Sequence, residues 1–254
     1  MSVTVIGSEL LGAFPDLVFG MSTRLGGVSA RPFGMNISYR VGDREDDVRR
    51  NRGLFLGKLG VPTDSLATTK QIHSSAVKVV TTPGENEDCD GLVTDCAGLF
   101  LGVTVADCVP VILVDPVQRI VAAIHAGWRG TAAGIVAKGI EVMVRDRGAE
   151  VSAIRVFLGP SAGVCCYVVG EEVAEQFPGD VVTRREGLIY LDVCEANRLQ
   201  LIEAGIRPFF IEESSLCTIS GGELLHSFRR DGKQSGRMMA VVGFRKGKKV
   251  EDRS

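Results

Sequence analysis

The sequence is poor in histidine, has a single tryptophan and lacks a long hydrophobic run. Its three histidines, His73, His125 and His226, limit how many imidazole groups any site can use. No run of about 18 apolar residues is present, so we expect no membrane span. The N-terminus lacks the basic segment of a secretory signal, which favours a cytoplasmic protein. Neither a GxGxxG pattern nor a P-loop occurs, so no known nucleotide-binding motif is present.

The charge balance and the cysteine content further limit the class of protein. The 29 basic and 31 acidic residues nearly balance, so we expect no nucleic-acid partner. The seven cysteines are odd in number and show no disulfide-scaffold spacing, which indicates reduced thiols. No linker divides the chain, and its length suits one large core, so we expect a single catalytic domain over residues 1–254 and a monomer.

The apolar pattern predicts an α/β fold. Short β-branched runs bounded by turn residues predict strands, and these fall at 15–22, 76–80, 99–105, 109–114, 120–124, 154–158, 206–211 and 239–244. Helical spacing of apolar residues predicts helices at 46–59, 131–147 and 192–204. Strands that alternate with a few helices favour mixed sheets.

The segment 99–130 carries the first candidate chemistry. Cys108 and His125 interrupt two apolar runs, and neighbouring strands would bring the two side chains close together. The predicted helix from Thr131 would place its free N–H groups and Arg129 beside His125. The alternative for each residue alone is structural, with Cys108 a small core side chain and His125 a hydrogen-bonded core histidine.

His73 distinguishes two possible functions of Cys108 and His125, a zinc site and a nucleophilic pair. Two imidazoles and one thiolate suit Zn²⁺, and three protein ligands leave the fourth position open, as in catalytic zinc sites, where a bound water has a pKa near 7. A Cys108–His125 nucleophilic pair uses the same atoms but leaves His73 idle. Cys165 and Cys166 are further candidate ligands, although in a strand at most one of them would face the site.

Four arginines and the tryptophan complete the candidate set. Arginine binds phosphate in a bidentate manner, and four arginines lie in turn or glycine-bearing segments: Arg24, Arg129, Arg229 and Arg230. A surface or ion-paired role is the alternative for each of them. Trp128 could stack on a base or seal the core.

Nine segments together resemble the laccase-domain family, whose members are also called polyphenol oxidases or purine nucleoside phosphorylases. The segments run in order from about residue 18 to 244: TRLGGVS, NISYRVGD, QIH, DGLVT, ADCVPVILVDP, HAGWRGT, GPSAGVCCYVVG, LDVCEANRLQL and HSFRRDGKQSGR. The resemblance implies one α/β domain with mixed sheets flanked by helices, similar to putative cysteine hydrolases related to cytotoxic necrotizing factors. It also implies a metal held by His73, Cys108 and His125.

The resemblance implies chemistry on purine nucleosides. This comprises phosphorolysis of adenosine, inosine and methylthioadenosine, and deamination of adenosine; older descriptions imply copper-dependent oxidation of phenols. A multicopper centre needs many more imidazoles than three histidines supply, so we reject that mechanism, although copper could bind at the single site. The H-x-E…P-C-x-x-C deaminase signature is absent, so the acid–base group must lie elsewhere, with Asp107 and Asp90 as candidates.

The leading hypothesis is a cytoplasmic zinc enzyme that acts on a purine nucleoside and phosphate. We assign catalysis to Cys108, His125 and Asp107. We assign substrate and phosphate binding to Arg24, Arg129, Arg229 and Asn36. The alternatives are a cysteine hydrolase or amidase that uses Cys108 and His125, a copper-dependent phenol oxidoreductase, and a non-enzymatic binding module stabilised by metal.

Overall fold

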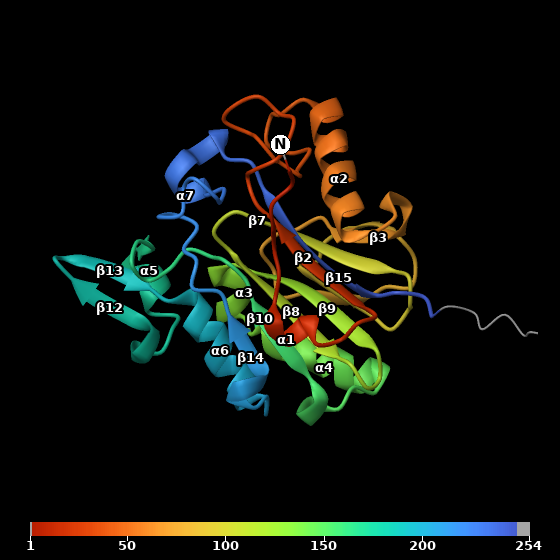
Figure 1. Cartoon of the computed structure of the whole chain (residues 1–254). Coiled ribbons are helices and arrows are strands. Elements are labelled where there is room, and N and C mark those ends of the chain that lie inside the picture. The colour runs from red at the N-terminus through yellow and green to blue at the C-terminus, as the bar shows by residue number, and fades with distance from the viewer. Residues whose placement is uncertain (1, 248–254) are drawn as a thin grey trace, which may run out of the picture.

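Two six-stranded sheets pack face to face at the centre of the protein (Figure 1). The computed structural model describes residues 2–247, so the ends of the expected domain, Met1 and residues 248–254, lie outside the described residues. The first sheet contains, in order across it, β1 (Val5–Ile6), β2 (Leu17–Ser22), β15 (Met238–Phe244), β7 (Phe100–Val105), β3 (Leu66–Thr69) and β5 (Gly84–Asn86). The second contains β14 (Ile211–Glu213), β10 (Arg155–Leu158), β8 (Val109–Asp115), β9 (Ile120–Ala126), β6 (Gly91–Thr94) and β4 (Val77–Val79).

A small third sheet and short helices complete the fold. The third sheet contains β11 (Val168–Val169), β13 (Leu188–Leu191) and β12 (Val182–Arg185), and its β12–β13 hairpin projects from one side of the body in Figure 1. The α-helices are α1 (Glu9–Gly12), α2 (Glu45–Leu59), α3 (Trp128–Ala132), α4 (Ile135–Arg147), α5 (Glu171–Ala174), α6 (Val193–Glu203) and α7 (Phe228–Asp231). Short 3₁₀ turns lie at Thr63–Ser65, Val151–Ala153, Gly179–Val181, Pro208–Phe210 and Gly232–Gln234.

The continuous apolar run of β8 reflects burial on both faces. Val111 and Leu113 point toward a cluster that includes residues of α4 and α6, whereas Ile112 and Val114 point into the space between the two sheets. Successive side chains of a strand alternate between faces, so a strand covered on both sides must be apolar throughout. On the outer face of the first sheet, α2 packs through residues such as Phe55. The protein therefore has four layers: α2, the first sheet, the second sheet, and the pair α4 and α6. In Figure 1, α2 lies at the top of the molecule and α4 and α6 lie at the bottom.

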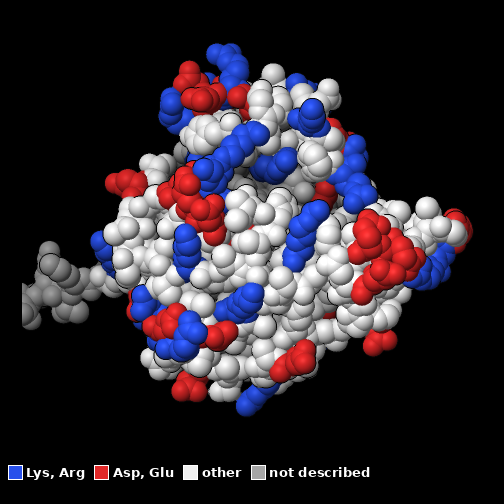
Figure 2. Space-filling view, turned by 180° about the vertical axis from the view of Figure 1, so that it is seen from behind, with Lys and Arg blue, Asp and Glu red and all other residues white. Residues whose placement is uncertain are grey.

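Both large sheets combine parallel and antiparallel strand pairs, which confirms the predicted mixed α/β class. The central strands and α2 lie within a few residues of their predicted ranges. None of the helices in residues 2–247 is long and apolar enough to cross a membrane. All seven cysteines are free thiols. On the face drawn in Figure 2, basic and acidic side chains are interspersed.

Two predicted boundaries were wrong, and one hairpin was not predicted, each for a local reason. The predicted helix 131–147 is two helices, because Gly134 adopts a left-handed conformation (φ 72°) that ends α3 and begins α4. The predicted strand 206–211 starts only at Ile211, because Pro208 opens a 3₁₀ turn. The sequence analysis missed the β12–β13 hairpin, whose turn residues Glu186 and Gly187 both have positive φ, as tight hairpin turns require.

His226, the third histidine, is a core residue. Its side chain is fully buried, and both ring nitrogens lack a hydrogen-bond partner among the described residues. Burial is the main reason that the pKa of His226 falls to about 3. The nearby charges are those of Arg24, Asp231, Arg237 and Arg230, of which only that of Asp231 raises the pKa. The imidazole is therefore neutral in the folded protein.

The buried neutral imidazole predicts a specific loss of stability in mild acid. The unfolded chain binds a proton at His226 below pH about 6.5, whereas the folded chain does not until pH about 3. Stability should therefore fall as pH decreases through this window, by up to about 1.4 kcal/mol per pH unit from this group. Urea unfolding of the wild type and of His226→Leu should give a stability difference that is constant above pH 7 and changes below it. A difference independent of pH throughout would contradict the assignment.

Candidate metal centre and active-site cavity

Strand register brings Cys108 and His125 together. In the antiparallel β8–β9 pair, Pro110 lies opposite His125 and Val109 lies opposite Ala126. Cys108 lies in the bend just before β8, two residues before Pro110, and its Sγ atom lies within 4.8 Å of a ring nitrogen of His125. The predicted proximity of this pair follows directly from the pairing of two core strands.

His73 reaches the pair from the connection between β3 and β4. Its backbone has a φ of 59°, a left-handed conformation that is unfavourable for a side chain with a Cβ. The carboxylate of Asp90 holds this conformation in place: it accepts hydrogen bonds from the backbone N–H groups of Ile72 (3.2 Å), His73 (3.0 Å) and Ser74 (2.7 Å), and from Ser74 Oγ (2.8 Å). Asp90 therefore fixes the loop that carries His73.

The same carboxylate orients His125. The Nδ1 atom of His125 lies 2.9 Å from Asp90 Oδ1, and both side chains are buried. An ionised carboxylate only accepts hydrogen bonds, so Nδ1 of His125 is the donor and Nε2 remains free to bind. Carboxylate–histidine pairs of this kind set the tautomer and basicity of metal-binding histidines.

The charges of the site favour an ionised thiol. Burial opposes ionisation of Cys108, but the positive charge and hydrogen bond of His125, and then those of His73, lower the pKa of the thiol to about 6. Burial likewise opposes protonation of His125, but the charge of Cys108 and the hydrogen bond to Asp90 raise its pKa to about 9. Asp90 is a carboxylate at neutral pH, because hydrogen bonds from His125 and Ser74 outweigh burial and lower its pKa to about 2.

The three side chains fit a metal ion. One ligand atom each from His73, Cys108 and His125 lies within 4.8 Å of the others. Gly127 leaves the space beside them open: a Cβ there would lie 2.9 Å from Cys108 Sγ and 3.2 Å from His73 Cδ2. Two imidazoles and a thiolate are donors that zinc and copper accept, and three ligands leave a position open.

The candidate centre lies in a cavity of about 450 Å³ that is rich in arginine. Four arginines, Arg40, Arg129, Arg229 and Arg237, line it together with only one acidic residue, Asp107. Three aromatic side chains, Trp128, Tyr167 and Phe228, also line it. A cavity with this charge balance attracts an anion, and its aromatic side chains offer flat surfaces to a ring.

The structure places Asp107, Arg129 and Arg229 in this cavity. The guanidinium of Arg129 lies 4.1 Å above the Trp128 ring, and it has no carboxylate within ion-pair distance among residues 2–247. Asp107 accepts hydrogen bonds from Thr218 Oγ1 and from the backbone N–H of Arg229, both at 2.6 Å. The backbone of Asp107 has a strained φ of 94°. The two hydrogen bonds stabilise this conformation and connect the carboxylate to the segment that carries Arg229.

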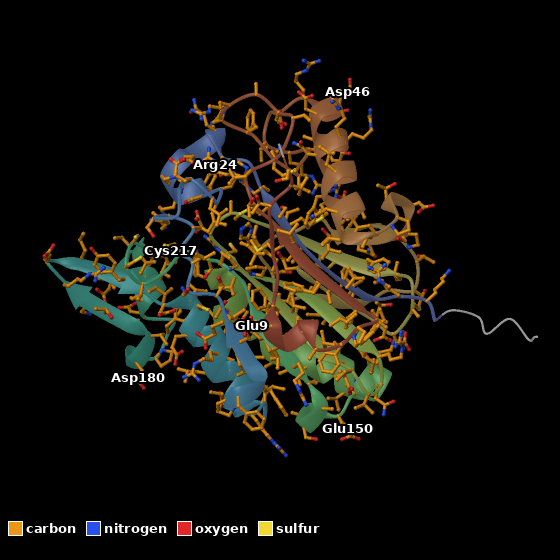
Figure 3. All side chains as sticks on the ribbon, in the orientation of Figure 1. Glu9, Arg24, Asp46, Glu150, Asp180 and Cys217 are labelled. Carbon is orange, nitrogen blue, oxygen red and sulfur yellow. The ribbon has the colours of Figure 1, made fainter. Side chains whose placement is uncertain are left out.

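Arg24 and Asn36 do not line this cavity. The guanidinium of Arg24 donates to the carbonyl oxygens of Gly222 and Pro32, and Figure 3 shows this residue near α7. The buried side chain of Asn36 accepts a hydrogen bond from the backbone N–H of Arg237 (2.9 Å). Asn36 is thus placed to position a residue of the cavity wall.

Several wall residues escaped the sequence analysis. Arg40 and Arg237 enter from 36–43 and from the segment before β15; both lie in segments quoted for the family resemblance, NISYRVGD and HSFRRDGKQSGR, but neither arginine was singled out there. Gln71 offered a signal in the pattern QIH: its side-chain amide donates to the carbonyl of Thr104 and accepts from the backbone N–H of Thr104. These bonds fix the histidine loop against β7.

Two finer expectations need correction. The helix beside the centre begins at Trp128 rather than at Thr131 and has only five residues, so it offers no extended helix dipole to an anion. Cys165 and Cys166 lie in a turn rather than a strand, so both thiols face the same way, and their Sγ atoms are 3.0 Å apart. They cluster with Cys217 and not with Cys108.

Residues 18–245 match the family described as multi-copper polyphenol oxidoreductase laccase. The chain belongs to this laccase-domain family. The fold, the three candidate ligands and the cavity described above are therefore those of a laccase-domain protein.

Similar proteins carry names from nucleoside chemistry. A purine nucleoside phosphorylase of Deinococcus radiodurans is 39% identical over 95% of this chain and 95% of its own. A protein from an unknown prokaryote named adenosine deaminase RL5 is 37% identical over 89% of this chain and 93% of its own. YlmD of Geobacillus stearothermophilus, also named a purine nucleoside phosphorylase, is 36% identical over 91% of this chain and 92% of its own. Its crystal structure covers 97% of both chains with a TM-score of 0.90.

The three candidate ligands predict a single tight zinc site. His73→Ala and Cys108→Ser should each release zinc to a competing chelator at concentrations at which the wild type holds about one ion per chain. Cys96→Ser is the matched control, because this cysteine lies outside the candidate centre. Metal analysis after dialysis against graded chelator gives the affinities. Equal retention by His73→Ala and the control would show that His73 is not a ligand.

Proposed function

We propose that the protein is a zinc enzyme of purine nucleosides that catalyses both phosphorolysis and deamination. The observation that carries the proposal is the convergence of His73, Cys108 and His125 at an arginine-rich cavity. The names of its relatives support the class of substrate. Adenosine, inosine and methylthioadenosine are the proposed substrates of phosphorolysis, and adenosine is the substrate of deamination.

The metal centre would be held by residues that the protein already orients. His73, Cys108 and His125 would hold zinc, with copper as a competitor for the same donors. Bound there, zinc supplies a Lewis acid with one open coordination position. Asp90 accepts a hydrogen bond from Nδ1 of His125, so Nε2 is the ring atom that would bind the metal, after it gives up the proton that it carries at the raised pKa of about 9.

The cavity wall would hold the two substrates of phosphorolysis. In that reaction a phosphate oxygen forms a bond to C1′ of the ribose while the bond from C1′ to the base nitrogen breaks, and the base leaves with a proton. Arg129 and Arg229 supply the charge that binds phosphate, and the rings of Trp128 and Tyr167 face the same cavity as stacking surfaces for the purine. Holding both reactants in one cavity supplies proximity.

Asp107 is the proposed proton-transfer residue. It is the only acidic side chain in the cavity wall. It accepts one hydrogen bond on each oxygen, and a carboxylate has further lone pairs on both. In deamination the 6-amino group leaves as ammonia and an oxygen from water replaces it, so the leaving nitrogen must gain a proton. We assign the return of that proton to Asp107. By contrast, every bond of Asp90 serves to position the loop and His125.

A monomer in the cytoplasm fits this proposal. One chain supplies every residue that we assign to the site, so no second subunit is required. The free thiols suit a reducing compartment.

A cysteine hydrolase is the second candidate. The Cys108 thiol, the imidazole of His125 and the carboxylate of Asp90 form the sequence of contacts expected of a nucleophile, its base and an orienting acid. His73 has no role in this mechanism. It predicts an amidase activity that survives metal removal, and alkylation of Cys108 in the metal-free protein would abolish that activity.

Nucleoside assays test the proposed function directly. Purified protein incubated with adenosine and phosphate should form adenine and ribose 1-phosphate, whereas adenosine without phosphate should form only inosine and ammonia. Both activities should disappear after chelation and return with zinc. Chromatography of the products, with heat-inactivated protein as the control, separates the two reactions. Failure to form any product from purine nucleosides would overturn the proposal.

Arg129→Ala should separate phosphorolysis from deamination. Loss of a charge-assisted contact to phosphate costs about 1.5–3 kcal/mol, so the KM for phosphate should rise about 10- to 100-fold. Deamination uses no phosphate and should change much less. Arg49→Ala is the control, because Arg49 lies on α2 and pairs with Asp46 outside the cavity. An equal loss of both activities would assign Arg129 to the nucleoside instead.

A further inference from the structure

A second cluster of metal-binding side chains lies outside the proposed active site. The Sγ atoms of Cys165, Cys166 and Cys217 all lie within 4.8 Å of one another. No imidazole or carboxylate belongs to this group among the described residues. Figure 3 labels Cys217 near the base of the projecting hairpin. Neither the family resemblance nor the proposed nucleoside chemistry uses these three thiols.

Two separate loops bring the thiols together. A tight turn places Cys165 and Cys166 side by side, because the backbone N–H groups of Cys166 and Tyr167 both donate to the carbonyl of Gly163. The second loop lies alongside through an isolated parallel bridge between Ser161 and Cys217. The cluster therefore depends on the tertiary fold, not on sequence spacing, since 50 residues or more separate Cys217 from the other two.

The space between the thiols is shaped by Gly163. A Cβ at this position would lie in van der Waals contact with the Sγ atoms of both Cys165 and Cys217, at 3.5 Å, so Gly163 lies directly beside the cluster. The backbone N–H of Gly163 also donates to Cys217 Sγ (3.3 Å), which favours the thiolate. Gly163 thus contacts two of the thiols and stabilises the negative charge of one of them.

The thiols of the cluster do not ionise equally: the hydrogen bond with Cys166, followed by burial, raises the pKa of Cys165 to about 12. Arg185 donates to the carbonyl oxygens of Val164 and Cys165, and Arg230 donates to the carbonyl of Thr218, the neighbour of Cys217. Burial opposes ionisation of Cys217, but hydrogen bonds from Ser220 and Gly163 lower its pKa to about 7.

We propose that Cys165, Cys166 and Cys217 form a binding site for a thiophilic metal cation, with Cu(I) as the preferred ion. Thiolate ligands without nitrogen or oxygen donors select soft ions such as Cu(I), whereas structural zinc sites use four protein ligands. Three sulfur donors match a cation that accepts a low coordination number. Each thiol that binds gives up its proton to the solvent, and no electron is transferred. The proposal does not rest on the proposed nucleoside activity.

A cation at this site would tie together two loops of the cavity wall. Cys166 is followed by Tyr167, which lines the cavity. Cys217 is followed by Thr218, whose hydroxyl donates to Asp107. The site is thus structurally continuous with the cavity, while its donor atoms are separate from those of the zinc centre.

Titration with Cu(I) tests the site in a Cys108→Ser background, which removes the thiolate of the other centre. Under anaerobic conditions with a thiol-free reductant, this variant should take one Cu(I) per chain from a chromogenic Cu(I) chelator and develop ultraviolet thiolate-to-copper absorption. Adding Cys165→Ser and Cys217→Ser should lower the affinity at least 100-fold and remove the absorption. Cys96→Ser and Cys194→Ser, added instead, are the matched control for the loss of two thiols.

Two results would overturn the proposal. The first is equal Cu(I) affinity in the variant that carries Cys165→Ser and Cys217→Ser and in the matched control. The second is tighter binding of Zn²⁺ than of Cu(I) in parallel titrations. Circular dichroism checks that each variant is folded. If Cys108→Ser does not fold, the same comparison is made in full-length protein that already holds one equivalent of zinc. The expected result is then one additional Cu(I) that depends on Cys165 and Cys217.

Discussion

The arrangement of the site depends on one buried carboxylate. Asp90 lies just before β6, and its two oxygens accept hydrogen bonds from three successive backbone N–H groups, from Ser74 Oγ and from His125 Nδ1. These bonds hold His73 in a left-handed conformation and fix the ring of His125 in one tautomer. Without these hydrogen bonds, the strained conformation of the His73 loop would be destabilised. A single charged group therefore joins a loop and a strand into a set of three converging ligands.

The same atoms are compatible with metal binding and with thiol nucleophilicity. An ionised thiol beside two imidazoles can bind a cation or attack a carbonyl, and Asp90 orients His125 for either role. His73 favours the metal, because a third ligand at this distance has no function in a nucleophilic pair. An imidazole-rich multicopper cluster does not fit this chain. Only two of its three histidines approach the centre, and His226 is buried elsewhere.

The local sequence pattern was sufficient to predict the core strands of the fold and part of the candidate site. Two adjacent apolar runs, one that begins just after Cys108 and one that contains His125, predict neighbouring strands, and their pairing brings the two side chains together. Sequence spacing could not place His73, because its position depends on a positive φ and on the distant carboxylate of Asp90. Arg24 resembles an anion ligand in a glycine-rich loop, yet its guanidinium bonds carbonyl oxygens, since loop packing is not encoded in local pattern. The convergence of Cys165 and Cys166 was missed because a turn, unlike a strand, lets adjacent side chains point the same way.

X-ray absorption at the zinc edge tests the central claim most directly. Protein that carries one equivalent of zinc should show two imidazole nitrogens at about 2.0–2.1 Å and one sulfur at about 2.3 Å, with the remaining position taken by a light atom from solvent. That ligand set corresponds only to His73, Cys108 and His125 among the clusters of residues 2–247. A shell of three sulfurs without imidazole, or one made entirely of oxygen, would contradict the account.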